Sequence, residues 1–256
     1  DYDAGHIPGS AFLDLQAGYR QALAAAGETP ELPEGDEDRS CYVVVEKILV
    51  GAERLCPHWA VHGTTGYDFL NLLNGLFVDA DGRQPFEGLY NRFIGHTWSM
   101  EDVAYESKQL LLDVAMSGEL HVLARHLDRL SEQHRWSRDF TLFSLQAALR
   151  EVIACFPVYR TYIGADKNCA SAEDRGAIAQ AVQLAKRRNP AISASLFDFL
   201  ASLLLLDDPE DLDEAQRARR RNFVMRFQQL TGPVMAKGLE DTAFYRTYPL
   251  ASLNEV

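Results

Sequence analysis

A long series of segments with helical periodicity most constrains what this chain can fold into. Between residues 85 and 230, apolar side chains recur about every 3.6 residues in one segment after another, which is the spacing of one face of an α-helix. The segments are 85–98, 99–116, 119–134, 138–156, 171–188, 193–206 and 212–230. Short connections favour antiparallel packing of neighbouring helices. The sequence therefore predicts a mainly helical subdomain.

Polar residues mark the expected starts of three of these helices. Ser99 and Ser171 each precede acidic residues, as N-cap residues commonly do. The acidic stretch 207–210 contains Pro209, and both negative charge and proline favour a helix N-terminus. We therefore expect this stretch to open the last long helix.

The first 84 residues have a different pattern, with strand signals between helical ones. Residues 10–26 have helical spacing, and the acidic stretch 28–40 is typical of a loop. Strands are expected at 41–46 and around 60–63, followed by a helix over 67–78. A strand, a helical linker and a second strand predict a β/α unit with parallel strands.

Length, composition and charge limit the possible partners. The chain has 256 residues, which is enough for one large domain or a domain with a substantial insertion. Its formal net charge of −12 repels phosphate backbones, so we expect no nucleic-acid partner. A neutral ligand such as a sugar or a peptide is compatible with this charge.

Cysteine usage and the chain ends indicate the setting of the protein. Cys41, Cys56, Cys155 and Cys169 form no CxxC pair, so we expect reduced structural thiols in a cytoplasmic protein. Uninterrupted apolar runs such as 203–206 are too short to cross a bilayer, so no membrane partner is expected. The chain begins with acidic residues instead of Met and ends abruptly, which predicts a piece of a longer protein.

Glu46 follows four strand-forming residues directly, where a charge is unfavourable for a buried strand. In a parallel β/α barrel, side chains at the carboxyl ends of the strands face the active site. A carboxylate held there beside apolar walls loses solvation, which raises its pKa and suits a general acid. The alternative is a strand-ending acid that pairs with Lys47 or Arg54 at the surface.

The next segment, 56–71, mixes flat aromatic faces with short polar groups. Its members are Trp59, Tyr67 and Phe69, with Thr64, Thr65 and Asp68. Sugars present apolar CH faces flanked by hydroxyl groups, so this mixture favours a glycan subsite. The alternative is an ordinary helix start with Thr65 as its N-cap, and both interpretations can hold together.

A third cluster of charged and aromatic residues lies in 231–249. Its members are Lys237, Glu240, Asp241 and Arg246, with Phe244, Tyr245 and Tyr248. Gly232, Pro233 and Gly238 are expected to break the preceding helix and to leave this cluster on an irregular loop. Such residues on a loop are often functional. The alternative is a salt-bridged surface loop.

Motifs of other enzyme classes are absent from the sequence. There is no HExxH, and His121 and His126 are spaced wrongly for one helical face, so no metal site is expected. GxSxG, GxxxxGK[ST] and GxGxxG are also missing, and we expect no cofactor. The arginine-rich stretch 217–221 is expected to be a solvated helix face.

Four stretches resemble a known family, in the same order along the chain. They are VVVEKIL (43–49), HWAVHGTTGYDFLN (58–71), FPVYRTYI (156–163) and TGPVMAKGLEDTAFYR (231–246), ahead of LASLNEV. Together they look like the maltooligosyltrehalose synthase family of the α-amylase superfamily. His62 is a departure, because the family more usually has a small residue there, and its role stays open.

The resemblance implies an α/β fold class that is predominantly helical, as part of a (β/α)8 TIM barrel. The chain would hold about strands five and six in residues 1–84, a large helical insertion in 85–230, and a loop returning to the active site in 231–256. The implied reaction converts the reducing-end α-1,4 linkage of a maltooligosaccharide to an α,α-1,1 linkage. Glu46 matches the acid/base of this family.

The resemblance also implies what this chain lacks. An Asp nucleophile and a supporting Asp are expected outside it, so the chain alone is expected to be inactive. The remainder of the parent chain and a maltooligosaccharide are its expected partners. Two alternatives stay open: a related glucan hydrolase or transferase that shares Glu46, and a non-catalytic helical module over 85–230.

Isomerisation requires a site that excludes water while the released glucose turns over. Aromatic walls and hydroxyl-binding groups from three parts of the chain are expected to do this. They are Trp59, Tyr67, Tyr90, Phe244 and Tyr248, with Lys237 and Arg246. The helical insertion would act as the lid.

Overall fold

The computed structural model describes residues 42–255, apart from residues 52, 56–58, 60, 134, 165–169, 208, 210 and 211. The helix predicted at 10–26 and the loop predicted at 28–40 lie outside the described residues, as do Cys41, Cys56 and Cys169. Cys155 is a buried free thiol, as predicted for a structural cysteine.

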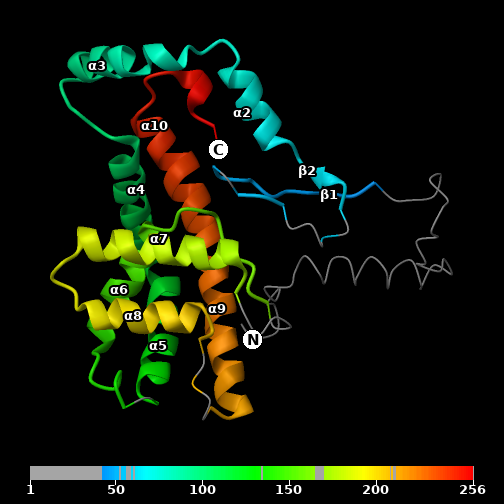
Figure 1. The fold of residues 1–256 in the computed structure, drawn as a ribbon. Coiled ribbons are helices and arrows are strands. Elements are labelled where there is room, and N and C mark those ends of the chain that lie inside the picture. The colour runs from blue at the N-terminus through cyan, green and yellow to red at the C-terminus, as the bar shows by residue number, and fades with distance from the viewer. Residues whose placement is uncertain are drawn as a thin grey trace, which may run out of the picture.

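Two short parallel strands lie beside the helical body (Figure 1). β1 (Val44–Val45) pairs with β2 (Gly63–Thr64). The pairing continues on both sides, because His62 N–H donates to Val43 O at 2.7 Å and Thr65 N–H donates to the last residue of β1 at 3.0 Å. The predicted parallel pair is therefore confirmed, although both strands are shorter than predicted and β2 begins at the end of the expected range. The predicted helical linker is not found, because the described residues of 46–62 form no helix.

Two helices follow the strands. α2 (Tyr67–Gly75) begins after Gly66, whose φ of 91° is a left-handed conformation that glycine adopts without a Cβ penalty. Thr65 is therefore not the N-cap, contrary to the alternative interpretation of this segment. A short 3-10 helix, η2 (Ala80–Gly82), leads into α3 (Arg83–Ile94). Neither α2 nor α3 contains a buried residue.

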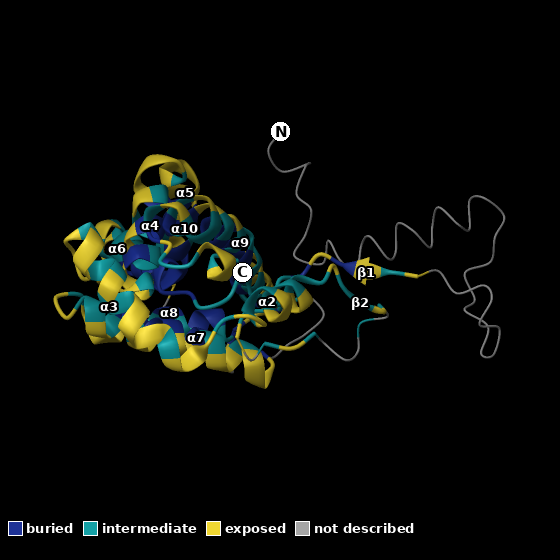
Figure 2. Cartoon of the chain, turned by 90° about the horizontal axis from the view of Figure 1, so that it is seen from above, coloured by how far each residue is buried: buried dark blue, intermediate teal, exposed yellow. Residues whose placement is uncertain are grey.

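The helices from α4 to α9 enclose the core. They are α4 (Met100–Val114), α5 (Ser117–Ser131), α6 (Leu142–Ala154), α7 (Ala172–Arg188), α8 (Ala194–Leu204) and α9 (Glu214–Met235). Their buried apolar side chains form one cluster, in which Phe197, Phe223 and Phe227 are the largest. Figure 2 shows this buried interior in dark blue. The prediction of a predominantly helical fold is confirmed.

The helix starts agree with the sequence at two of three places. Ser99 and Ser171 are N-caps, and each accepts a backbone N–H in the first turn. The prediction for 207–210 is wrong, because α9 starts after Asp213, which forms a reciprocal capping box with Gln216. Asp207 accepts from Arg175 instead.

The end of α9 differs from the prediction of a broken helix and an irregular loop. The helix runs through Pro233 to Met235 and continues as the π-helix η3 (Ala236–Ala243), followed by α10 (Phe244–Arg246) and the 3-10 helix η4 (Ala251–Leu253). Burial of Val234 and Met235, and of Gly238 against α4, outweighs the helix-breaking tendency of these residues. The predicted boundary at residue 230 falls within α9, and the domain limits stay predictions.

Candidate functional site

Glu46 lies immediately after β1 and is exposed. The surface pairing considered for it is not formed in the described chain, because Lys47 is buried and pairs with Glu53, with Nζ and Oε1 2.5 Å apart. The expected apolar walls around Glu46 are also not present, since the described residues supply a sheet of two strands. Glu46 is therefore an exposed carboxylate at the carboxyl end of a parallel strand, and it forms no ion pair with the described residues.

The GTTGYD stretch lies beside Glu46, because Thr65 N–H donates to Val45 O. Within this stretch, Thr64 Oγ1 donates to Asp68 Oδ1 at 3.1 Å and accepts from Gly66 N–H at 3.2 Å. These bonds fix the turn between β2 and α2. The structure thus brings Glu46 together with Thr64, Thr65 and Asp68 at the same edge of the strand pair.

Trp59 packs on the extended stretch 156–164 between α6 and α7. Its ring meets the Tyr162 ring edge-on, with centroids 5.0 Å apart. Lys47 Nζ and the Arg160 guanidinium lie 4.9 and 4.8 Å from the centroid of the same tyrosine ring. Tyr162 is thus a hub that joins the strand region to the helical body.

Tyr159 provides the second junction, which sequence reasoning missed as a site feature. Its hydroxyl donates to Glu240 Oε1 at 2.5 Å. Burial, together with the charge and hydrogen bond of Glu240, raises the pKa of Tyr159, and Tyr67 and Glu255 act in the same direction. Glu240 is thus the direct partner of this phenol. The density of tyrosines in FPVYRTYI was the available signal.

The cluster predicted in 231–249 divides between surface and anchored side chains. Lys237 and Asp241 form an exposed i,i+4 ion pair, as the surface alternative proposed for them. Arg246 is anchored to α4, since its guanidinium donates to Ser107 Oγ and to Glu106 Oε2, both at 3.0 Å. It also lies over the Trp98 ring, 5.4 Å from the centroid.

Tyr90 and the C-terminal segment are in contact, while their role as a substrate wall stays a prediction. Tyr248 N–H donates to the Tyr90 hydroxyl at 3.3 Å. Tyr245 and Tyr248 are exposed, and Phe244 is half-buried. Asn254 holds this segment by donating to the carbonyls of Phe244 and Thr247, and η4 packs against α2. The C-terminal residues thus contact the helix that follows the GTTGYD turn.

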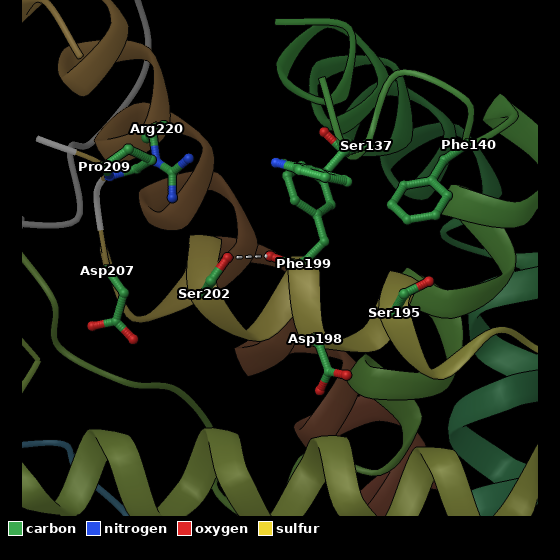
Figure 3. Close-up of a pocket in the computed structure, with 10 residues that line it drawn as sticks. Ser137, Phe140, Ser195, Asp198, Phe199, Ser202, Asp207, Pro209 and Arg220 are labelled. Carbon is green, nitrogen blue, oxygen red and sulfur yellow. Dashed lines mark hydrogen bonds between the residues drawn. The ribbon is translucent and has the colours of Figure 1, made fainter. Parts of the chain in front are cut away.

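A separate pocket of about 320 Å³ opens between α8 and the segments that precede α6 and α9 (Figure 3). Its lining includes Trp136, Phe140, Phe199 and the buried Arg220. None of the residues predicted from the sequence lines it. It is therefore distinct from the candidate site.

The residues that the structure describes include neither a metal site nor a membrane-spanning helix. No group of histidine, cysteine and acidic side chains there is arranged to hold a metal ion. No helix among those residues is both long enough and apolar enough to cross a membrane.

Comparisons with known proteins place this geometry in context. A putative maltooligosyl trehalose synthase of Mycobacterium tuberculosis is 32% identical over 221 residues, which are 85% of this chain and 25% of the relative. The structure of maltooligosyltrehalose synthase from Arthrobacter ramosus covers 92% of this chain with a TM-score of 0.65 and 27% identity. The relatives of this chain are maltooligosyl trehalose synthases.

The resemblance identified from the motifs is therefore confirmed. A solved glycosyltrehalose synthase, designated DSM5389, also matches 83% of this chain with a TM-score of 0.53 and 26% identity. No family model matches the chain. The chain spans about a quarter of the length of the synthases that it matches.

Proposed function

We propose that the full-length protein converts the reducing-end α-1,4 linkage of maltooligosaccharides to an α,α-1,1 linkage, with Glu46 as the general acid/base. The observation that carries this proposal is the position of Glu46, at the carboxyl end of a parallel strand and beside the GTTGYD turn. The similarity to maltooligosyl trehalose synthases supports it.

The chemistry requires two carboxyl groups. A retaining glycosidic reaction needs an acid that protonates the leaving oxygen and a nucleophile about 5 Å away that forms the glycosyl-enzyme. Glu46 would provide the proton. The nucleophile and a supporting aspartate would come from the remainder of the parent chain, so the 256-residue chain alone would be inactive.

Exposed apolar surface on α2 and α3 supports packing against that remainder. Phe77, in the turn just after α2, is 92% exposed, Phe93 on α3 is 88% exposed, and α2 and α3 bury none of their residues. Soluble proteins rarely leave such contiguous apolar faces open. We propose that β1 and β2 are part of strands five and six of a barrel, with α2 as the helix after β2 and α4–α9 as the insertion. Other barrel elements would cover these faces.

The closing wall would be built from the C-terminal segment. Tyr248 is held by Tyr90, and Arg246 by α4, so both have defined positions. Phe244 and Tyr248 would retain the released glucose and exclude water, while Lys237 and Arg246 bind hydroxyl groups. The proposed substrate-binding set also includes residues of the GTTGYD stretch, of the preceding segment and of the C-terminal cluster: Trp59, Tyr67, Thr64, Thr65, Asp68, Glu240, Asp241 and Tyr245.

The test is product analysis of the full-length protein with maltopentaose by NMR. The proposal predicts an α,α-1,1 anomeric signal with little free glucose, and no product from residues 1–256 alone. Replacing Phe244 or Tyr248 with alanine should raise the ratio of glucose to trehalosyl product. Free reducing-end glucose as the main wild-type product would favour a hydrolase and contradict the proposal.

A further inference from the structure

We propose that Lys108 is a positioning residue that fixes segment 236–248, the closing wall of the site; this inference rests on the proposed function. Lys108 lies on α4 and is only 6% exposed, so little of its side chain is accessible to solvent or to a ligand. It would act through the residues that it touches.

The closing wall begins with a π-helix, whose turns are wider than those of an α-helix. Thr242 Oγ1 donates to Lys237 O, five residues earlier, at 2.8 Å within η3. Such π segments occur frequently at functional sites. The directions in which Phe244 and Tyr248 point therefore depend on how η3 is held.

Lys108 holds η3 through close backbone contact. A Cβ placed on Gly238 would lie 2.7 Å from Lys108 Cγ and 3.0 Å from Lys108 Cα. Real Cβ atoms do not approach other atoms so closely, so glycine allows η3 to rest directly on α4. The π-helix thus packs directly on the aliphatic part of the Lys108 side chain.

The ammonium group of Lys108 makes a second contact. It donates to Phe156 O at 2.9 Å, where the extended stretch 156–164 begins. Tyr159 in that stretch donates to Glu240 of η3. A closed ring of contacts therefore surrounds the start of the closing wall. It runs from Lys108 to Phe156, along the chain to Tyr159, across to Glu240, and through Gly238 back to Lys108.

A role in positioning explains this ring better than a role in stability. Burial lowers the pKa of Lys108 to about 8, which reports the cost of desolvating the ammonium. No ion pair to Lys108 compensates that cost within the described residues. The hydrogen bond to Phe156 O offsets only part of that cost, so the net contribution of the ammonium to stability should be small. The ammonium instead fixes the position of the Phe156 carbonyl through its hydrogen bond.

The experiment compares Lys108→Met with Lys186→Met in the full-length protein. Methionine keeps the unbranched stem beneath Gly238 but cannot donate to Phe156 O. Lys186 is the control, because its ion pair with Asp198 joins α7 to α8 outside the ring. Three measurements are made: the glucose-to-trehalosyl product ratio with maltopentaose, amide exchange of residues 236–248, and the thermal midpoint.

For Lys108→Met we expect a severalfold higher proportion of glucose among the products. We also expect about tenfold faster amide exchange confined to 236–248, which corresponds to the loss of one hydrogen bond to a charged group. The thermal midpoint should change by only a few degrees. Lys186→Met should leave the product ratio and this exchange unchanged. An unaltered ratio together with unaltered exchange overturns the inference, and so does faster exchange spread over the whole helical body.

The failure of the proposed function is distinguishable from the failure of this inference. If the wild-type protein forms no α,α-1,1 product, the proposed function fails, and amide exchange alone decides the role of Lys108. Faster exchange limited to 236–248 would then still assign Lys108 to positioning that segment. Unchanged exchange would remove the assignment.

Discussion

The helical body and the strand region of this chain differ in how far each completes its own core. Helices α4–α9 bury a continuous apolar cluster, whereas α2 and α3 contain no buried residue and expose phenylalanine and leucine side chains. The proposed acid, Glu46, belongs to the open region. Stability therefore resides in the helical body, whereas the proposed chemistry resides in a region whose apolar side chains are open to further packing.

The largest stability contrast is expected between two phenylalanines. Phe197 is fully buried, so Phe197→Ala should lower the free energy of unfolding by about 3–5 kcal/mol. Phe77 is 92% exposed, so Phe77→Ala should cost less than about 0.5 kcal/mol in residues 1–256. Urea unfolding followed by circular dichroism measures both.

The same pair tests whether the parent chain covers the open face. In the full-length protein, Phe77→Ala should become clearly destabilising if barrel elements pack on the turn that follows α2. A cost for Phe77→Ala that is equally small in both proteins would contradict the proposed cover.

A smaller contrast is expected between two helical glycines. Gly238→Ala forces a Cβ against Lys108 and should destabilise by about 1–3 kcal/mol, the range for overpacking. Gly176 on α7 has no atom within 4 Å of a built Cβ, so Gly176→Ala should stabilise by about 0.5–1 kcal/mol. The thermal midpoints of the two variants should therefore shift in opposite directions. A shift of both midpoints in the same direction would contradict the close packing of η3 against α4.

The smallest contrast concerns two hydroxyl groups. Ser171 caps α7, so Ser171→Ala should cost about 1 kcal/mol of stability without changing activity. Thr64 stabilises the exposed turn beside Glu46, so Thr64→Ala should cost less stability but weaken maltooligosaccharide turnover in the full-length protein. Denaturation and product assays on both variants measure these effects. Equal activity of the two variants would show that the turn held by Thr64 does not contribute to the active site.

The sequence predicted the helical body well because its signals are local. Apolar periodicity located α4–α9, and Ser99 and Ser171 marked their starts correctly. The end of α9 could not be predicted in this way, since Gly232, Pro233 and Gly238 favour a break when they are considered alone. Contact between η3 and α4 reverses that preference, and such contact is visible only in three dimensions.

The candidate site was predictable in part. The position of Glu46 after a parallel strand followed from strand order and from the family resemblance. The Tyr159–Glu240 bond joins residues 81 positions apart, and Arg246 reaches α4 across 139. No local pattern encodes such pairings. The expected apolar walls around Glu46 were not found among the described residues, which supply a sheet of only two strands, and under the proposed function neighbouring barrel elements would supply them.

The most direct test of the account is Glu46→Gln in the full-length protein, with the exposed Glu119→Gln as its control. Turnover of maltopentaose should fall by roughly 10²–10⁴-fold while the affinity for this sugar and the thermal midpoint persist, because only a transferable proton is removed. A maltosyl fluoride donor should be affected far less, since fluoride departs without protonation. Wild-type turnover of maltopentaose by the Glu46→Gln variant would contradict the assignment of Glu46 as the acid.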